Sequence, residues 1–112
     1  MATIPAAVSR SEGPTESVEQ QFRRLANTWK NAVALLSSST ARESHPAYQE
    51  IIGLGDAVVP FLLRDLEQNN THWFAALHVI TGADPIQAAD AGNIPRMRDA
   101  WVRWALANGY RW

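Results

Sequence analysis

Apolar side chains recur every three or four residues along most of this chain, which is the spacing of one face of an α-helix. The clearest series consists of Val18, Phe22, Leu25, Trp29, Ala32 and Leu36. Thr15 can cap the start of this helix, and the serine-rich run at residues 37–40 can end it, because serine hydroxyls compete with helical hydrogen bonds. We therefore predict a helix over about residues 16–36, followed by a turn. The series also suits a coiled-coil seam, but it is too short for one and favours packing onto the rest of the domain.

Proline and glycine mark the next helix. Pro46 follows His45, and proline is favoured at the first helical position because its missing N–H costs nothing there. His45 or its neighbour Ser44 then lies near the cap. Gly53 and Gly55 favour the end of this helix, since glycine accepts the left-handed conformation common at helix ends.

Two further helices are predicted over residues 56–81. Asp56 is a candidate cap for the first, which runs to about residue 68, and Asn70 or Thr71 is a candidate cap for the second, which Gly82 closes. The connection between them is short. Helices joined in this way lie antiparallel.

The final part of the chain is predicted to be a loop followed by one more helix. Residues 83–93 have room for at most one short helical turn, and Asn93 is placed to cap a helix that ends before Gly109. Strand patterns are nearly absent. We expect an all-α fold, a compact bundle of about five helices, with the pair at 56–81 packed between the first and last helices. Residues 1–15 are expected to form a flexible N-terminal arm, and residues 16–112 a single helical domain.

Composition places this domain among folded proteins of a reducing compartment. The chain has 112 residues, of which 46% are hydrophobic, and it has no cysteine, so neither disulfides nor thiolate sites are available. A signal peptide and a membrane helix are not expected, since no apolar run is long enough. We therefore expect a cytoplasmic protein that does not enter a membrane.

Charge is distributed unevenly along the chain. Residues 43–90 carry seven acidic side chains and one arginine, whereas residues 91–112 carry four arginines and one aspartate. The acidic middle argues against broad binding of nucleic acid, which needs a basic surface. A local phosphate contact through Arg96, Arg98 and Arg103 is an alternative. Arg96, Asp99 and Arg103 follow one another at spacings of three and four, a ladder that usually marks a solvated face.

Aromatic residues give the strongest indication of function. The chain has five tryptophans, and Trp29, Trp101 and Trp104 fall on apolar helical faces, where we expect them in the core. Trp73 and Trp112 are different, because Trp73 follows a polar cap and Trp112 follows a glycine-containing tail. Exposed tryptophan, tyrosine and arginine are typical of binding hot spots. The predicted partner-binding residues are His72, Trp73, Tyr110, Arg111 and Trp112; the alternative is that the tail folds back and covers the core.

Catalytic and metal-binding patterns are weak. His72 and His78 are six residues apart, which places them on different sides of a helix, and His45 can approach them only through the fold. These three histidines, with an acidic residue, are the candidates for a metal site. Otherwise His45 helps to cap a helix and His78 is partly buried. Asp65 and Glu67 do not face each other on a helix and are expected to be solvated. No catalytic constellation and no cofactor are predicted.

One segment of the sequence resembles a known repeat. Residues 51–66, IIGLGDAVVPFLLRDL, followed by residues 73–77, WFAAL, resemble a single HEAT-like repeat in the order of glycine, proline and paired helices. The resemblance covers about residues 48–82 and implies an antiparallel helix pair. HEAT-like proteins stack several repeats, whereas here one is clear, and His72 and Trp73 replace the arginine or aspartate often found at the start of the second helix. The longer stretch from His45 to Trp101 looks like a group of small bacterial proteins of unknown function.

These observations predict a non-enzymatic protein-interaction module, for example an adaptor, an inhibitor or an antitoxin-like neutraliser of another protein. A nucleic-acid-binding accessory protein that uses the basic C-terminal helix is one alternative. A small metal-dependent enzyme that uses the histidines is the other.

Overall fold

The computed structural model describes residues 16–36 and 38–112. Over these residues the chain forms six α-helices and two short 3₁₀ helices and no strand, which confirms the all-α prediction. The elements are α2 (Val18–Val33), α3 (Ser39–Glu43), α4 (Pro46–Gly53), η1 (Gly55–Val58), α5 (Val59–Asn69), α6 (Phe74–Thr81), η2 (Ala88–Asp90) and α7 (Ile94–Ala107). The predicted arm at residues 1–15 lies outside the described residues.

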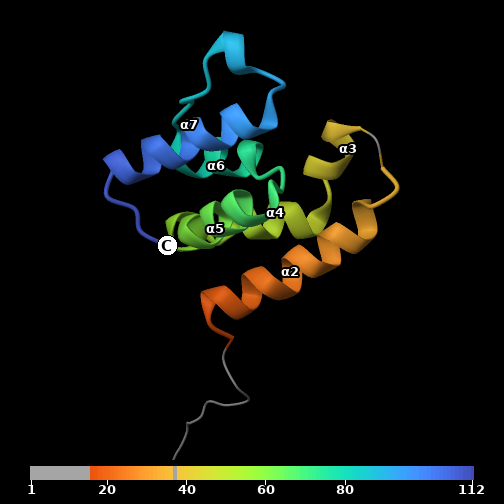
Figure 1. The fold of residues 1–112 in the computed structure, drawn as a ribbon. Coiled ribbons are helices and arrows are strands. Elements are labelled where there is room, and N and C mark those ends of the chain that lie inside the picture. The colour runs from red at the N-terminus through yellow and green to blue at the C-terminus, as the bar shows by residue number, and fades with distance from the viewer. Residues whose placement is uncertain (1–15, 37) are drawn as a thin grey trace, which may run out of the picture.

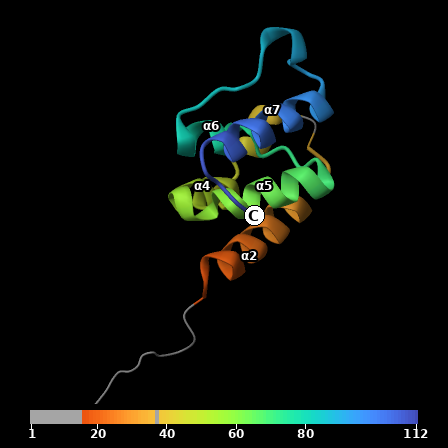
Figure 2. The ribbon, with the colours of Figure 1, turned by 60° about the vertical axis from the view of Figure 1, so that its left-hand side comes forward.

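The helices are arranged around α4 and α5. Figures 1 and 2 show these two helices with α2 on one side and α6 and α7 on the other. The predicted pair over residues 56–81 is present as η1 with α5, and α6. Because α6 packs against α4 as well as against η1 and α5, the pair is not a separate unit.

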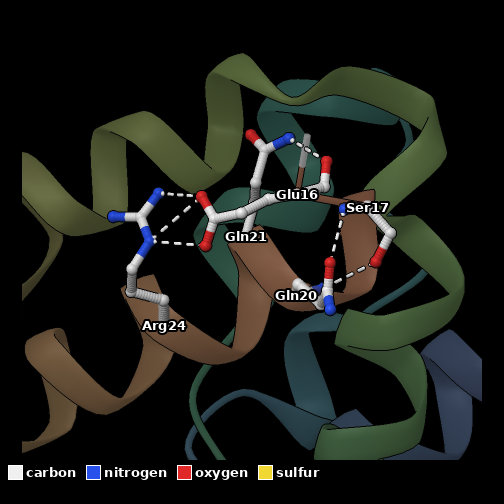
Figure 3. A network of polar contacts seen from close by, with 5 residues as sticks. All are labelled: Glu16, Ser17, Gln20, Gln21 and Arg24. Carbon is white, nitrogen blue, oxygen red and sulfur yellow. Dashed lines mark hydrogen bonds and ion pairs between the residues drawn. The ribbon is translucent and has the colours of Figure 1, made fainter. Parts of the chain in front are cut away.

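A network of polar contacts fixes the start of α2 (Figure 3). The Ser17 hydroxyl accepts from the backbone N–H of Gln20 at 3.1 Å, and the Gln20 side chain accepts from the backbone N–H of Ser17 at 2.8 Å. Glu16 pairs with Arg24, eight residues further along the chain. This reciprocal capping satisfies two N–H groups that the helix leaves without partners. The cap of α2 is therefore Ser17, so the prediction of Thr15 as the cap is wrong.

The end of α2 differs from the prediction. The helix stops at Val33, which is buried, whereas Ala32 and Leu36 are exposed. Instead of a turn, Ser38 then caps the short helix α3 by accepting from the backbone N–H of Ala41. Serine at a cap favours a helix start as much as it opposes a helix interior, and the prediction used only the second property.

Two predicted helix starts are confirmed. The Nδ1 atom of His45 accepts from the backbone N–H of Ala47 at 3.0 Å, and Oδ1 of Asn93 accepts from the backbone N–H of Arg96 at 3.2 Å. Each is followed by proline within the first turn. The predicted single helical turn between residues 83 and 93 is η2.

Two predicted caps are wrong. Asp56 does not cap α5, because the chain turns at Gly55, with a φ of 72°, and enters α5 through η1. Neither Asn70 nor Thr71 caps α6, whose cap position is Trp73 and has no side-chain hydrogen bond. Asn70 instead ends α5 in the left-handed conformation, which asparagine tolerates better than most residues.

The core is rich in aromatic rings. Trp29, Tyr48 and Trp73 pack with ring centroids 4.8–5.4 Å apart, and Phe22 lies 5.5 Å from Trp73. Trp29 and Trp101 are buried as predicted, whereas Trp104 is only partly buried and packs against the core from α7.

Candidate protein-binding groove

A hollow lined by polar and apolar side chains lies between α2 and α5. It has a volume of about 290 Å³, close to the lower end of the range for ligand pockets. Its lining consists of Glu19, Phe22, Arg23, Ala26, Asn27 and Lys30 from α2 and Phe61, Arg64, Asp65 and Gln68 from α5. These positions repeat every three or four residues, so the groove follows one face of each helix.

Two phenylalanines form the apolar part of this groove. Phe22 of α2 and Phe61 of α5 stack with ring centroids 6.3 Å apart. Phe22 is buried, whereas Phe61 is only partly covered. An apolar ring is therefore accessible between the two helices.

Arg64 lies beside this ring. Its Cζ is 5.7 Å from the centroid of Phe61, within the range of a cation–π contact. The nearest carboxylate is that of Glu19, whose Oε2 lies 3.8 Å from Nη1 of Arg64 but only 2.6 Å from Nη2 of Arg23. A separation of 3.8 Å is too long for a hydrogen bond. Glu19 therefore bonds Arg23, and within residues 16–36 and 38–112 the guanidinium of Arg64 has no hydrogen-bond acceptor.

Asp65, on the same helix as Arg64, links the two walls of the groove. Its carboxylate accepts from Trp73 Nε1 at 2.7 Å, from Asn69 Nδ2 at 2.6 Å and from Lys30 Nζ, which lies 3.1 Å from Oδ2. Burial raises the pKa of Asp65, but hydrogen bonds from Trp73, Asn69, Lys30 and Thr71 outweigh burial and hold that pKa below its ordinary value. The side chain is 12% exposed, so the prediction that Asp65 is solvated is wrong.

Trp73 supports the groove from behind. Its side chain is 0% exposed, so the prediction that Trp73 is an exposed partner anchor is wrong. The polar residues before it suggested exposure, yet the indole turns inward and its N–H reaches Asp65, eight residues earlier. Tyr48 holds the same segment, since its hydroxyl donates to the carbonyl of His72 and accepts from the backbone N–H of Ala76.

The tail at residues 110–112 folds back onto α5 and η1. Tyr110 donates a hydrogen bond to Asp56, and Trp112 Nε1 donates to Glu67 Oε1 at 3.0 Å. Both rings pack against the core and stay partly exposed. The hydrogen bond that Tyr110 donates to the Asp56 carboxylate raises the pKa of Tyr110. Of the two predictions for this tail, the folded-back arrangement is confirmed; Arg111 between the two rings is exposed.

His72 lies apart from this tail, in a second hollow of about 260 Å³. It is exposed and its ring lies 5.9 Å from that of Phe74. The other lining residues are Trp29, Arg42, Glu43, Gly92, Ile94 and Met97. The structure therefore does not bring the five predicted partner-binding residues together.

The arginines of α7 are close to carboxylates. Arg96 lies 3.4 Å from Asp90, and Arg98 lies 3.1 Å from Asp99. Arg103 is exposed and shares a hollow of about 180 Å³ with Asp90, Arg96 and Asp99. Since this hollow has equal numbers of positive and negative side chains, the arrangement fits a solvated face better than a phosphate site.

The three histidines are distributed over separate parts of the fold. His45 caps α4, His72 lies in the second hollow, and His78 is exposed with Nδ1 2.8 Å from the carbonyl oxygen of Ala83, so the prediction that His78 is partly buried is wrong. In the described part of the chain, no three side chains of histidine, aspartate or glutamate lie close enough to hold a metal ion. Among the same residues, no helix is both long and apolar enough to cross a membrane.

Comparison with known proteins gives no relative. No protein-family model matches the chain, and no curated protein or solved structure is significantly similar to it. The HEAT-like resemblance therefore stays a prediction, and the groove is interpreted from its own geometry.

The groove residues Glu19, Arg64 and Phe61 were missed as a site by the sequence analysis. The available signal was the spacing of Phe61, Arg64 and Gln68 on one face of a helix. That spacing does not show which helix lies opposite, and the facing residues on α2 are more than thirty positions away.

Proposed function

We propose that this protein is a non-enzymatic protein-binding module and that the groove between α2 and α5 is its binding surface. The observation that carries the proposal is the pairing of Phe61 with Arg64, an accessible ring beside a guanidinium whose hydrogen bonds are unused in the described residues. Aromatic residues and arginine supply most binding energy at protein interfaces. An arginine that already has a cation–π contact offers a planar set of donors to a partner.

The framework behind the groove supports this role. Asp65 ties Lys30 of α2 to Asn69 of α5 and to Trp73, so the two walls are held before a partner arrives. Preorganised surfaces lose less conformational freedom on binding and therefore bind more tightly. The absence of cysteine from the chain supports a cytoplasmic setting for this function, in which the module acts as an adaptor, an inhibitor or an antitoxin-like neutraliser of its partner.

The test is a comparison of complexes formed by the intact chain and by two variants. Tagged protein is incubated with an extract of the cells that produce it, bound proteins are identified by mass spectrometry, and the complex is rebuilt from purified components. We expect Arg64→Ala to lose the partner and Arg103→Ala, which changes an exposed arginine on α7, to keep it. A rebuilt complex that survives Arg64→Ala unchanged would show that the groove is not the binding surface.

A further inference from the structure

We infer that the α2–α5 groove binds an acidic amphipathic segment of the partner protein, with a carboxylate on Arg64 and an apolar side chain against Phe61. This inference rests on the proposed function and adds the chemistry of the partner. Charge complementarity in the groove carries it.

Positive side chains outnumber negative ones along the groove. The lining contains Arg23, Lys30 and Arg64 but only the carboxylates of Glu19 and Asp65. Although the protein has a net charge of −1, the groove is therefore locally basic. A partner side chain with a negative charge is attracted to it, whereas a basic one is repelled.

The two carboxylates of the groove are already engaged. Asp65 accepts hydrogen bonds from Trp73, Asn69 and Lys30, and Glu19 accepts a short one from Arg23. Within residues 16–36 and 38–112 the guanidinium of Arg64 has no hydrogen-bond acceptor; it lies beside the ring of Phe61, and the side chain is 43% exposed. The fork of an arginine binds both oxygens of a carboxylate at once, so this residue is the expected contact for an acidic side chain.

The length of the groove and the position of Phe61 define the length of the bound segment and the place of its apolar side chain. Its lining on α2 runs from Glu19 to Lys30, which corresponds to about 16 Å or three helical turns at the usual rise per residue. The exposed part of Phe61 lies one turn from Arg64. An apolar side chain three or four residues from an acidic one on a helix matches this spacing.

The same features favour a polypeptide over nucleic acid. A phosphate backbone presents closely spaced negative charges, which Glu19 and Asp65 on the two walls oppose. The sugar–phosphate backbone also has no aliphatic side chain to pack on the exposed part of Phe61. A polypeptide supplies one carboxylate and one apolar side chain at the required separation.

The experiment selects binding peptides without assuming their sequence. A library of random twelve-residue peptides displayed on phage is panned against the full chain at low salt. The enriched peptides are synthesised with a fluorescent label, and their affinity is measured by anisotropy. We expect enrichment of aspartate or glutamate together with leucine, methionine or phenylalanine, and we expect added sodium chloride to weaken binding.

Three variants locate the binding site. We expect Arg64→Ala to weaken binding at least about ten-fold, as for a hot-spot residue. Gln68→Trp should weaken it comparably by filling the groove from an exposed position without removing any packing. Arg103→Ala is the matched control and should leave affinity unchanged. Thermal unfolding of each variant confirms that it is folded.

The outcomes separate the partner chemistry from the proposed function. Basic or uncharged peptides whose binding is lost in Arg64→Ala and Gln68→Trp would overturn the inference and leave the groove as the binding surface. Peptides that bind both variants normally would contradict the groove itself. The inference would also be overturned if no peptide is enriched, or if a second copy of the chain competes at micromolar concentration. The rebuilt complex tests the proposed function separately.

Discussion

The α2–α5 groove and the outer face of α7 both carry several arginines and aspartates or glutamates, yet they differ in what lies beneath the charges. On α7, Arg96 and Arg98 each lie beside an aspartate, and the hollow between Arg96 and Arg103 is lined only by charged residues. In the groove, the charges surround two phenylalanine rings, and Arg64 has no hydrogen-bonded acceptor in the described part of the chain.

This difference shows why charge patterns alone do not identify a binding surface. Exposed ion pairs between neighbouring side chains contribute little to stability or to recognition. A guanidinium over an apolar ring has both a desolvated face and unused donors, which a partner can use. This difference supports the proposal that the groove binds a partner, whereas the charges on α7 fit a solvated surface.

The sharpest way to break this comparison is to remove one aspartate from each region. We expect Asp65→Ala to lower the free energy of unfolding by about 2–4 kcal/mol, because it leaves the Trp73 N–H buried without an acceptor and Lys30 without its partner. Asp99→Ala on α7 should change it by less than about 0.5 kcal/mol. Urea unfolding followed by tryptophan fluorescence measures both, and equal effects would contradict the structural distinction.

The dependence of stability on acidic pH tests the role of Asp65 further. The folded chain holds the pKa of Asp65 below its ordinary value of 3.8, so the carboxylate stabilises the fold above this pH. As the pH falls from about 3.8 through the lower folded-state pKa, this stabilisation is lost. We expect Asp65→Asn to be less stable at neutral pH and to show a smaller loss of stability over this acidic range. Thermal unfolding of the intact protein and of Asp65→Asn between pH 2 and 7 checks this expectation.

The helix boundaries that could be predicted are those with local signals. Pro46 after His45 and Pro95 after Asn93 define helix starts within two residues, and Gly82 ends α6 through its left-handed backbone. The end of α2 was harder to predict. Leu36 continues the apolar spacing, but Val33 is the last residue of the helix, and the chain then turns towards the cap of α3.

The groove could not be predicted, because it depends on contacts between residues distant in the sequence. The burial of Trp73 follows from a hydrogen bond to Asp65 and from rings supplied by α2 and α4. Local polarity around Trp73 suggested exposure. The partner-binding residues proposed from aromatic content therefore included one that belongs to the core and the tail residues Tyr110 and Trp112, which are attached to the domain.

A smaller effect on stability is expected from changes near α7. If apolar packing rather than arginine pairing holds α7 in place, the loss of a tail side chain should lower the free energy of unfolding more than the loss of an arginine from α7. We expect Trp112→Ala to reduce stability by about 1 kcal/mol, since it removes a partly buried ring and the hydrogen bond to Glu67. Arg96→Ala should have almost no effect. Urea unfolding compares the two, and a larger loss in Arg96→Ala would reverse this assignment.

The smallest expected effect concerns Arg64 in the absence of a partner. Its contact with Glu19 is long and exposed, so Arg64→Ala should change the free energy of unfolding by less than about 0.5 kcal/mol. The same variant is expected to weaken peptide binding strongly. A large loss of stability would show that Arg64 is needed for folding. In that case, only the Gln68→Trp variant would test peptide binding at the groove.

The most direct test of the groove is a map of the bound peptide by nuclear magnetic resonance. The isotope-labelled full chain is titrated with the selected acidic peptide, and backbone amide shifts are followed. Changes concentrated at residues 19–30 of α2 and 61–68 of α5, with residues 96–103 of α7 unaffected, are the predicted result. Changes concentrated on α7 or around His72, with the groove unaffected, would contradict the assignment of binding to the α2–α5 groove.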